Sequence, residues 1–143
     1  MDPENPIDPD DDIVILLVDD EERFLRTLSR RLVERNMTVL TARSGMEALE
    51  TVRQTPVSVV VLDIRMPGLD GLETLAELRK LRPGLQVILL TGHASIDAAT
   101  DGVRLGAYDY LLKPCDVDQL LDKIQAALKQ DSSIGLGTNA DQP

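Results

Sequence analysis

The chain alternates five times between short apolar runs and longer stretches whose apolar residues recur every three to four positions. The first pattern is typical of buried strands, and the second of helices that bury one face. The apolar runs cover residues 13–18, 37–41, 57–62, 86–90 and 108–112. Strands that alternate with helices through short connections form parallel sheets, and right-handed crossovers place the helices on both faces. The pattern therefore predicts one α/β domain built from five strand–helix units.

Two of the helical stretches carry a clear apolar stripe. The first contains Phe24, Leu25, Leu28 and Leu32, and the last contains Val117, Leu120, Leu121, Ile124 and Leu128. The stretch from about residue 95 to 105 is the weakest of the five, because its apolar stripe is thin and Gly102 lies in its interior. We expect a helix there that little apolar area holds in place.

Two capping boxes mark where the second and third helices begin. Ser44 is followed three residues later by Glu47, and Asp70 by Glu73. The helix that opens at Asp70 is expected to end near Leu81, since a Pro-Gly pair follows.

The composition of the strands indicates their places in the sheet. Runs 13–18, 57–62 and 86–90 are almost wholly apolar, as strands buried on both faces are. Runs 37–41 and 108–112 carry Thr, or Asp and Tyr, which is typical of edge strands. This distribution fits the flavodoxin-like strand order 2-1-3-4-5.

The composition favours a globular, cytoplasmic protein. Of the 143 residues, 43% are apolar, but the longest uninterrupted apolar run has six residues, against roughly 20 needed to cross a bilayer. The acidic, proline-rich N-terminus is unlike a secretory signal, and the single cysteine, Cys115, permits no internal disulfide. We therefore predict a cytoplasmic location and no membrane partner.

The negative charge is concentrated at the N-terminus. Residues 1–12 hold six acids and no base, so the charge on the remainder falls from −10 to −4. We expect an acidic disordered tail over 1–12, a domain over 13–130, and a second disordered tail or the start of a linker over 131–143. An acidic surface with three aromatic residues argues against nucleic-acid binding by this domain.

Carboxylates follow two of the buried strands directly. Asp19 and Asp20 come after the first strand, and Asp63 after the third. In sheets of this order the first and third strands are neighbours, and ligands bind beyond their carboxyl ends, where the strand order reverses. The three carboxylates should converge there, and such an all-oxygen cluster suits Mg²⁺.

Polar groups also end the next two strands. Thr91 closes the fourth strand, and Lys113 follows the fifth. A hydroxyl donor and a positive charge beside a metal site are groups that steady the oxygens of a bound phosphoryl group.

In four motifs the chain resembles the receiver domains of bacterial two-component response regulators, the family of the chemotaxis regulator. The motifs are VDDE at 18–21, LDIRMPGLDG at 62–71, LLTGHA at 89–94 and DYLLKP at 109–114. The resemblance covers about residues 13–129. It implies a phosphorylated signalling switch and not an enzyme, apart from self-phosphorylation by small donors and self-dephosphorylation.

The resemblance assigns the central role to Asp63 as phosphoacceptor. The phosphoryl group would come from a phosphohistidine on a sensor histidine kinase or a histidine phosphotransfer protein. Mg²⁺, for which Mn²⁺ would substitute, would be held by Asp20, Asp63 and the backbone carbonyl of Arg65, with Asp19 acting through water.

The remaining roles implied by the resemblance concern stabilisation and switching. Lys113 would contact the phosphoryl oxygens, and its bond to Pro114 would be cis. Thr91 would move toward the phosphoryl group and Tyr110 would rotate inward, which would alter the surface of the fourth helix, fifth strand and fifth helix. An output domain, a target protein or a phosphorylation-dependent homodimer partner would read that surface.

Three further residues lie near these motifs. The positions of Arg65 and His93, two residues after the acceptor and two after Thr91, influence dephosphorylation in the family, so both are expected to tune its rate. Cys115 is interpreted as a small buried apolar residue.

Three alternatives compete with an active receiver. A phosphohydrolase of the haloacid-dehalogenase type would carry its nucleophile in a D-x-D motif on the first strand, and the sequence after Asp63 lacks the second Asp. A flavodoxin-like FMN carrier would need a Ser, Thr and Gly loop where four acids stand at 19–22. A degenerate receiver would not accept phosphate, although every expected position here is filled.

Overall fold

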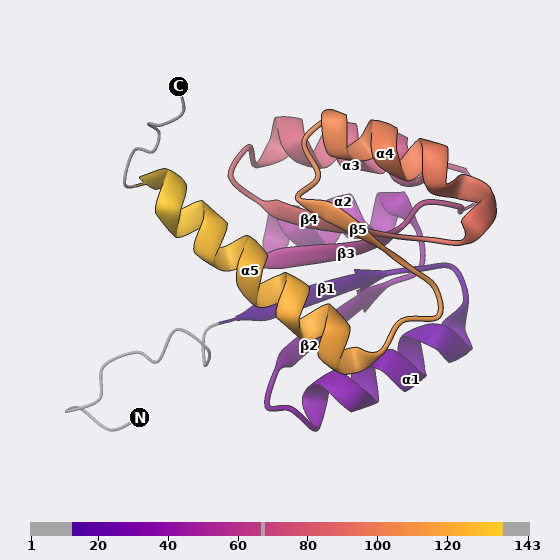
Figure 1. Ribbon diagram of the computed structural model, residues 1–143, viewed down its shortest axis with the longest axis vertical. Helices are drawn as coiled ribbons and strands as arrows, with labels where there is room; N and C mark the ends of the chain where they lie inside the picture. The colour runs from indigo at the N-terminus through magenta and orange to yellow at the C-terminus, as the bar shows by residue number, and fades with distance from the viewer. Residues whose placement is uncertain (1–12, 67, 136–143) are drawn as a thin grey trace.

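The computed structural model describes residues 13–66 and 68–135, with side chains up to Lys129. Within these residues a five-stranded parallel sheet has the order β2-β1-β3-β4-β5 (Figure 1). The strands are β1 (Val14–Val18), β2 (Thr38–Ala42), β3 (Val59–Asp63), β4 (Gln86–Thr91) and β5 (Asp109–Leu112). The predicted flavodoxin-like α/β fold, its strand order and its two edge strands are confirmed.

Five α-helices cover the sheet in two layers. They are α1 (Glu22–Val33), α2 (Gly45–Gln54), α3 (Gly71–Leu81), α4 (Ile96–Arg104) and α5 (Val117–Gly135), and a 3₁₀ turn, η2 (His93–Ser95), precedes α4. One face of the sheet packs against α1 and α5, and the other against α2, α3 and α4 (Figure 1).

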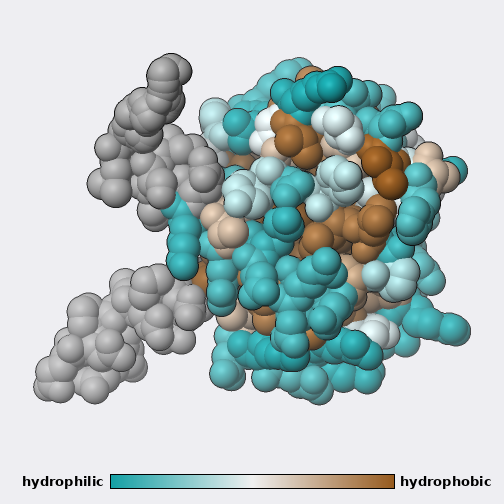
Figure 2. Space-filling model, viewed as in Figure 1, coloured by the Kyte–Doolittle hydropathy of each residue, from teal (hydrophilic) through white to brown (hydrophobic). Residues whose placement is uncertain are grey.

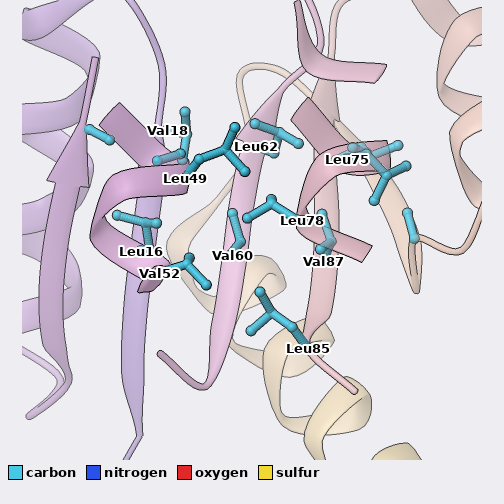
Figure 3. Packing of buried hydrophobic residues seen from close by; sticks show 14 of the residues in the cluster. Leu16, Val18, Leu49, Val52, Val60, Leu62, Leu75, Leu78, Leu85 and Val87 are labelled. Carbon is cyan, nitrogen blue, oxygen red and sulfur yellow. The ribbon is translucent and has the colours of Figure 1, made fainter. Parts of the chain in front are cut away.

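Successive residues of the central strands enter opposite layers. Leu16 and Val18 of β1 pack in the layer of α2 to α4, among leucines and valines of those helices and of β3 and β4 (Figure 3). Ile15 and Leu17 pack in the layer of α1 and α5. This alternation explains why the central strands are apolar throughout, since both of their faces are buried.

The edge strand β5 carries the same alternation with two tyrosines. Tyr110 packs against the layer of α2 to α4, and Tyr108, just before the strand, packs against the layer of α1 and α5. Both side chains are only partly buried, because β5 is the last strand at this edge of the sheet that the described residues form.

Only one of the two predicted capping boxes forms in full. The Asp70 side chain accepts from the N–H of Glu73, and the Glu73 carboxylate accepts from the N–H of Asp70. At α2, Ser44 accepts from the N–H of Glu47, but Glu47 accepts from the N–H of Arg43. The predicted hydrogen bond from the N–H of Ser44 to Glu47 is therefore wrong, because the donor is the preceding residue, Arg43.

Helix α4 forms where the sequence predicts it, whereas α5 is longer than expected. Helix α5 continues to Gly135, five residues beyond the boundary expected at 130, because extending an existing helix requires no further apolar face. In α4, a Cβ added to Gly102 would lie 2.4 Å from Cδ1 of Leu89. The glycine thus permits close packing of α4 on β4.

The acidic segment 1–12 lies outside the described residues. Among the described helices, none combines the length and the apolar character that crossing a membrane requires.

Candidate functional site

The strand register brings the predicted carboxylates together. Val18 of β1 pairs with Leu62 of β3, so the residues that follow, Asp19 and Asp63, are neighbours at the carboxyl edge of the sheet. Asp20 comes next in the chain, and oxygen atoms of the three carboxylates lie within 4.8 Å of one another. Asp19 and Asp63 are 1% and 6% exposed, whereas Asp20 is exposed to solvent.

Lys113 follows the edge strand β5, and its side chain extends to this cluster. Its backbone N–H donates to the carbonyl of Thr91 at 2.8 Å, which fixes the start of its side chain beside β4. The ammonium Nζ lies 2.7 Å from Oδ2 of Asp19 and 3.6 Å from Oδ1 of Asp63. The peptide bond from Lys113 to Pro114 is cis, as the resemblance implies.

Burial and like charge act against ionisation of Asp63. Burial, followed by the charge of Asp19, raises the pKa of the Asp63 carboxyl to about 6, although Lys113 and a hydrogen bond from the N–H of Arg65 act in the opposite direction. Burial and the charge of Asp19 thus outweigh the ion pair with Lys113, whose ammonium lies 3.6 Å from Asp63. The cluster holds more negative charge than one lysine neutralises.

The pKa of Lys113 moves in the direction expected for a neighbour of acids. Burial alone would lower this pKa, but the hydrogen bond to Asp19 and the charges of Asp63 and Asp19 outweigh burial and raise it above its usual value. The side chain therefore remains an ammonium group.

The three carboxylates fit a hard divalent cation. Asp19 already accepts at Oδ1 from the N–H of Glu21, at 2.9 Å, and at Oδ2 from Lys113. Asp20 and Asp63 are therefore the better direct donors, and the excess negative charge favours a cation bound by oxygen atoms.

The two expected switch residues lie on neighbouring strands. Thr91 is buried, and its hydroxyl donates to the carbonyl of Gly92 at 2.9 Å, not to Asp63. Tyr110 is partly buried against the layer of α2 to α4.

The other candidate residues surround the cluster. Arg65 and His93 are both exposed, and His93 begins the turn η2. Cys115 packs against the layer of α1 and α5 but is only half-buried, so it is less buried than predicted, and burial raises the pKa of its thiol.

Phe24 is one neighbour of the site that the sequence did not indicate. The Nζ of Lys113 lies 4.3 Å from the centroid of the Phe24 ring. Helical periodicity places Phe24 on the apolar face of α1, but it cannot show that the ring meets a lysine 89 positions later in the chain.

The fold places three acids where the strand order reverses and brings the lysine that follows β5 to them. Residues 15–125 match the sequence profile described as the response regulator receiver domain, and the chain belongs to this family. It is 40% identical over 116 residues to the transcriptional regulatory protein GlrR of Escherichia coli K12, covering 81% of this chain and 26% of that protein. It is 36% identical over 115 residues to the DNA-binding transcriptional regulator NtrC of the same strain, covering 80% and 24%.

Solved structures agree in fold. A response regulator receiver domain protein from Clostridium thermocellum has a TM-score of 0.80 and 35% identity, covering 85% of this chain and 98% of that one. NtrX from Brucella abortus has a TM-score of 0.79 and 34% identity, covering 83% and 27%. The chain thus spans about a quarter of the length of GlrR and of NtrC.

Proposed function

We propose that this chain is a phosphoaccepting switch that receives a phosphoryl group on Asp63 from a phosphohistidine. The observation that carries this proposal is a buried carboxylate with a raised pKa, held beside two further acids and the ammonium of Lys113. The donor would be a sensor histidine kinase or a histidine phosphotransfer protein, and the chain would act in the cytoplasm.

The transfer exchanges one bond at phosphorus for another. A carboxylate oxygen of Asp63 forms a bond to phosphorus while the phosphorus–nitrogen bond of the donor breaks, and the electron pair leaves with the imidazole. Such transfers depend on in-line positioning and on neutralisation of charge more than on a special nucleophile. Lys113 supplies positive charge 3.6 Å from the acceptor oxygen Oδ1, so it needs little movement to meet the incoming oxygens.

Asp20, Asp63 and the backbone carbonyl of Arg65 would hold Mg²⁺, and Asp19 would act through water. When bound, the cation neutralises the acids and the phosphoryl oxygens. Because Asp19 is already hydrogen-bonded at both oxygens, the donor set supports this division of roles. Mn²⁺, which also prefers oxygen donors, would substitute.

Phosphorylation would be read through α4, β5 and α5. The aspartyl phosphate offers new acceptor oxygens, and the Thr91 hydroxyl would exchange the carbonyl of Gly92 for one of them. Tyr110 would then pack further inward. In α4 only Ala99 and Gly102 are buried, so few contacts resist its displacement.

A surface for a partner lies beside these elements. Apolar residues show between the more hydrophilic surfaces of α4 and α5, over the edge strand β5 (Figure 2). An output domain, a target protein or a second copy of the chain would bind there when the surface rearranges.

The test is the intact-protein mass after incubation with Mg²⁺ and acetyl phosphate. We expect a gain of one phosphoryl group in the wild type, and none without Mg²⁺ or in Asp63→Asn. Beryllium fluoride serves as a second probe, because it binds a competent pocket even where dephosphorylation is fast. A wild-type protein that neither gains mass nor binds beryllium fluoride would contradict the proposal.

A further inference from the structure

Phe24 forms one wall of the space that holds the Lys113 ammonium. It lies four residues after Asp20, in the first turn of α1, and is partly buried against the layer of α1 and α5. The ring centroid is 4.3 Å from Nζ of Lys113, whose side chain is 23% exposed. The contact joins α1 to the residue that follows β5, whose ammonium also contacts Asp19 and Asp63.

A contact of this kind attracts the cation to the face of the ring. The ring face carries negative potential, and an ammonium within about 6 Å of the centroid is stabilised there. The ammonium has three donors. One meets Asp19 at 2.7 Å, a second side faces Asp63 at 3.6 Å, and the ring covers a third side without competing for a hydrogen bond.

We propose that Phe24 is a positioning residue, whose ring face holds the Lys113 ammonium between Asp19 and Asp63, ready for the incoming phosphoryl group. This inference rests on the proposed function. Without the ring, the long and flexible lysine side chain would be held by its two ion pairs alone, and the one to Asp19 at 2.7 Å is shorter than the one to Asp63 at 3.6 Å. A neutral ring restrains the ammonium without adding negative charge to a cluster that already has an excess.

The composition of the chain permits a sharp test, because Phe24 is its only phenylalanine. Expression with mono-, di- or trifluorophenylalanine changes this one ring, and each fluorine weakens the negative potential of its face while leaving the shape nearly the same. We expect the rate of mass gain from acetyl phosphate to fall with each fluorine, reaching about a two- to fivefold loss in the trifluoro protein and in Phe24→Leu. Phe24→Tyr, which keeps an aromatic face, should retain the wild-type rate.

A second measurement tests the contact without phosphorylation. The chain has four lysines, so the side-chain methylene signals of ¹³C-lysine-labelled protein can be assigned individually. Protons over an aromatic face are shifted upfield. We expect the Lys113 ε-methylene signals to lie upfield of those of the other three lysines, and to join them in Phe24→Leu.

The control is Leu28→Val, which removes apolar volume one turn further along α1 in the same layer. It should lower the free energy of unfolding and leave the phosphorylation rate unchanged. Unshifted Lys113 signals in the wild type, or a rate that stays the same across the fluorinated series, would overturn the role of Phe24. Absence of uptake in every protein, with no binding of beryllium fluoride, would instead overturn the proposed function and this role with it.

Discussion

At the scale of the single residue, folding and chemistry place opposite demands on Asp63. The carboxyl binds its proton more tightly in the folded protein, with a pKa of about 6, than in the unfolded chain, where 3.8 is usual. Ionisation therefore destabilises the fold. The resulting loss in the free energy of unfolding is absent below about pH 4 and complete above pH 6, where it amounts to about 3 kcal/mol.

We predict that Asp63→Asn stabilises the metal-free protein. In EDTA at pH 7.5 the free energy of unfolding should rise by about 1–3 kcal/mol, because the variant removes a buried charge beside Asp19. At pH 4 the gain should vanish. Urea unfolding at both pH values measures it.

Asp122→Asn is the matched control, since Asp122 is exposed on α5. It should change stability by less than about 0.5 kcal/mol at either pH. If Asp63→Asn were as neutral as this control at pH 7.5, the Asp63 carboxylate would not be under electrostatic strain.

Some of these residue positions could be predicted from the sequence and others could not. Asp19, Asp20, Asp63, Thr91 and Lys113 could be placed at one edge of the sheet, because each follows a strand directly and parallel strands end at the same edge. The contact of Phe24 with Lys113 could not, since it depends on how α1 tilts over that edge. The half-burial of Cys115 likewise depends on packing after the turn at Pro114.

At the scale of the element, the start of α3 is packed against the backbone that carries Asp63. A Cβ added to Gly71 would lie 2.5 Å from Cα of Ile64 and 2.6 Å from the carbonyl oxygen of Asp63. The N–H of Gly71 also donates to the carbonyl of Ile64 at 2.9 Å. The first turn of α3 therefore fixes the position of the acceptor strand end.

Gly71→Ala should disturb stability and phosphorylation together. We predict a loss of about 2 kcal/mol or more in the free energy of unfolding, because two backbone segments must separate. The rate of phosphoryl uptake should fall by about tenfold or more as Asp63 shifts. Urea unfolding and intact mass measure the two effects.

Gly84→Ala provides the comparison, because a Cβ there would meet nothing within 4 Å. It should be neutral or stabilise by up to about 1 kcal/mol, with an unchanged uptake rate. Equal effects of the two substitutions would show that α3 does not hold the acceptor strand in place.

The elements themselves were predictable to different degrees. The number, order and edges of the strands could be predicted from apolar runs and their polar interruptions, because a strand that is buried on both faces is apolar throughout. Helix ends were less certain. Glu47 accepts from the backbone of Arg43 instead of Ser44, and α5 passes residue 130, since local hydrogen bonds and helix extension leave little trace in the apolar pattern.

At the scale of the whole molecule, the cluster of acids connects cation binding to folding. The three carboxylates meet only when β1 and β3 are paired, so the unfolded chain offers no equivalent site. A cation that binds only the folded form stabilises it in proportion to its concentration relative to its dissociation constant.

We predict that Mg²⁺ raises the thermal midpoint in a saturable way. At 100 times the dissociation constant, the added stability should be about 2.7 kcal/mol. Asp20→Asn should abolish most of this gain, whereas Asp101→Asn, an exposed change on α4, should keep it. Scanning calorimetry over a Mg²⁺ series measures it, and an equal gain in both variants would place the cation elsewhere.

The two tyrosines on either side of β5 give the protein its own optical signal. The chain contains no tryptophan, so its near-ultraviolet emission arises from Tyr108 and Tyr110 alone. Because one ring borders the layer of α1 and α5 and the other the layer of α2 to α4, quenching and absorbance changes sample both sides of the same strand. Replacing either ring by phenylalanine would leave an unlabelled protein whose fluorescence follows one side at a time.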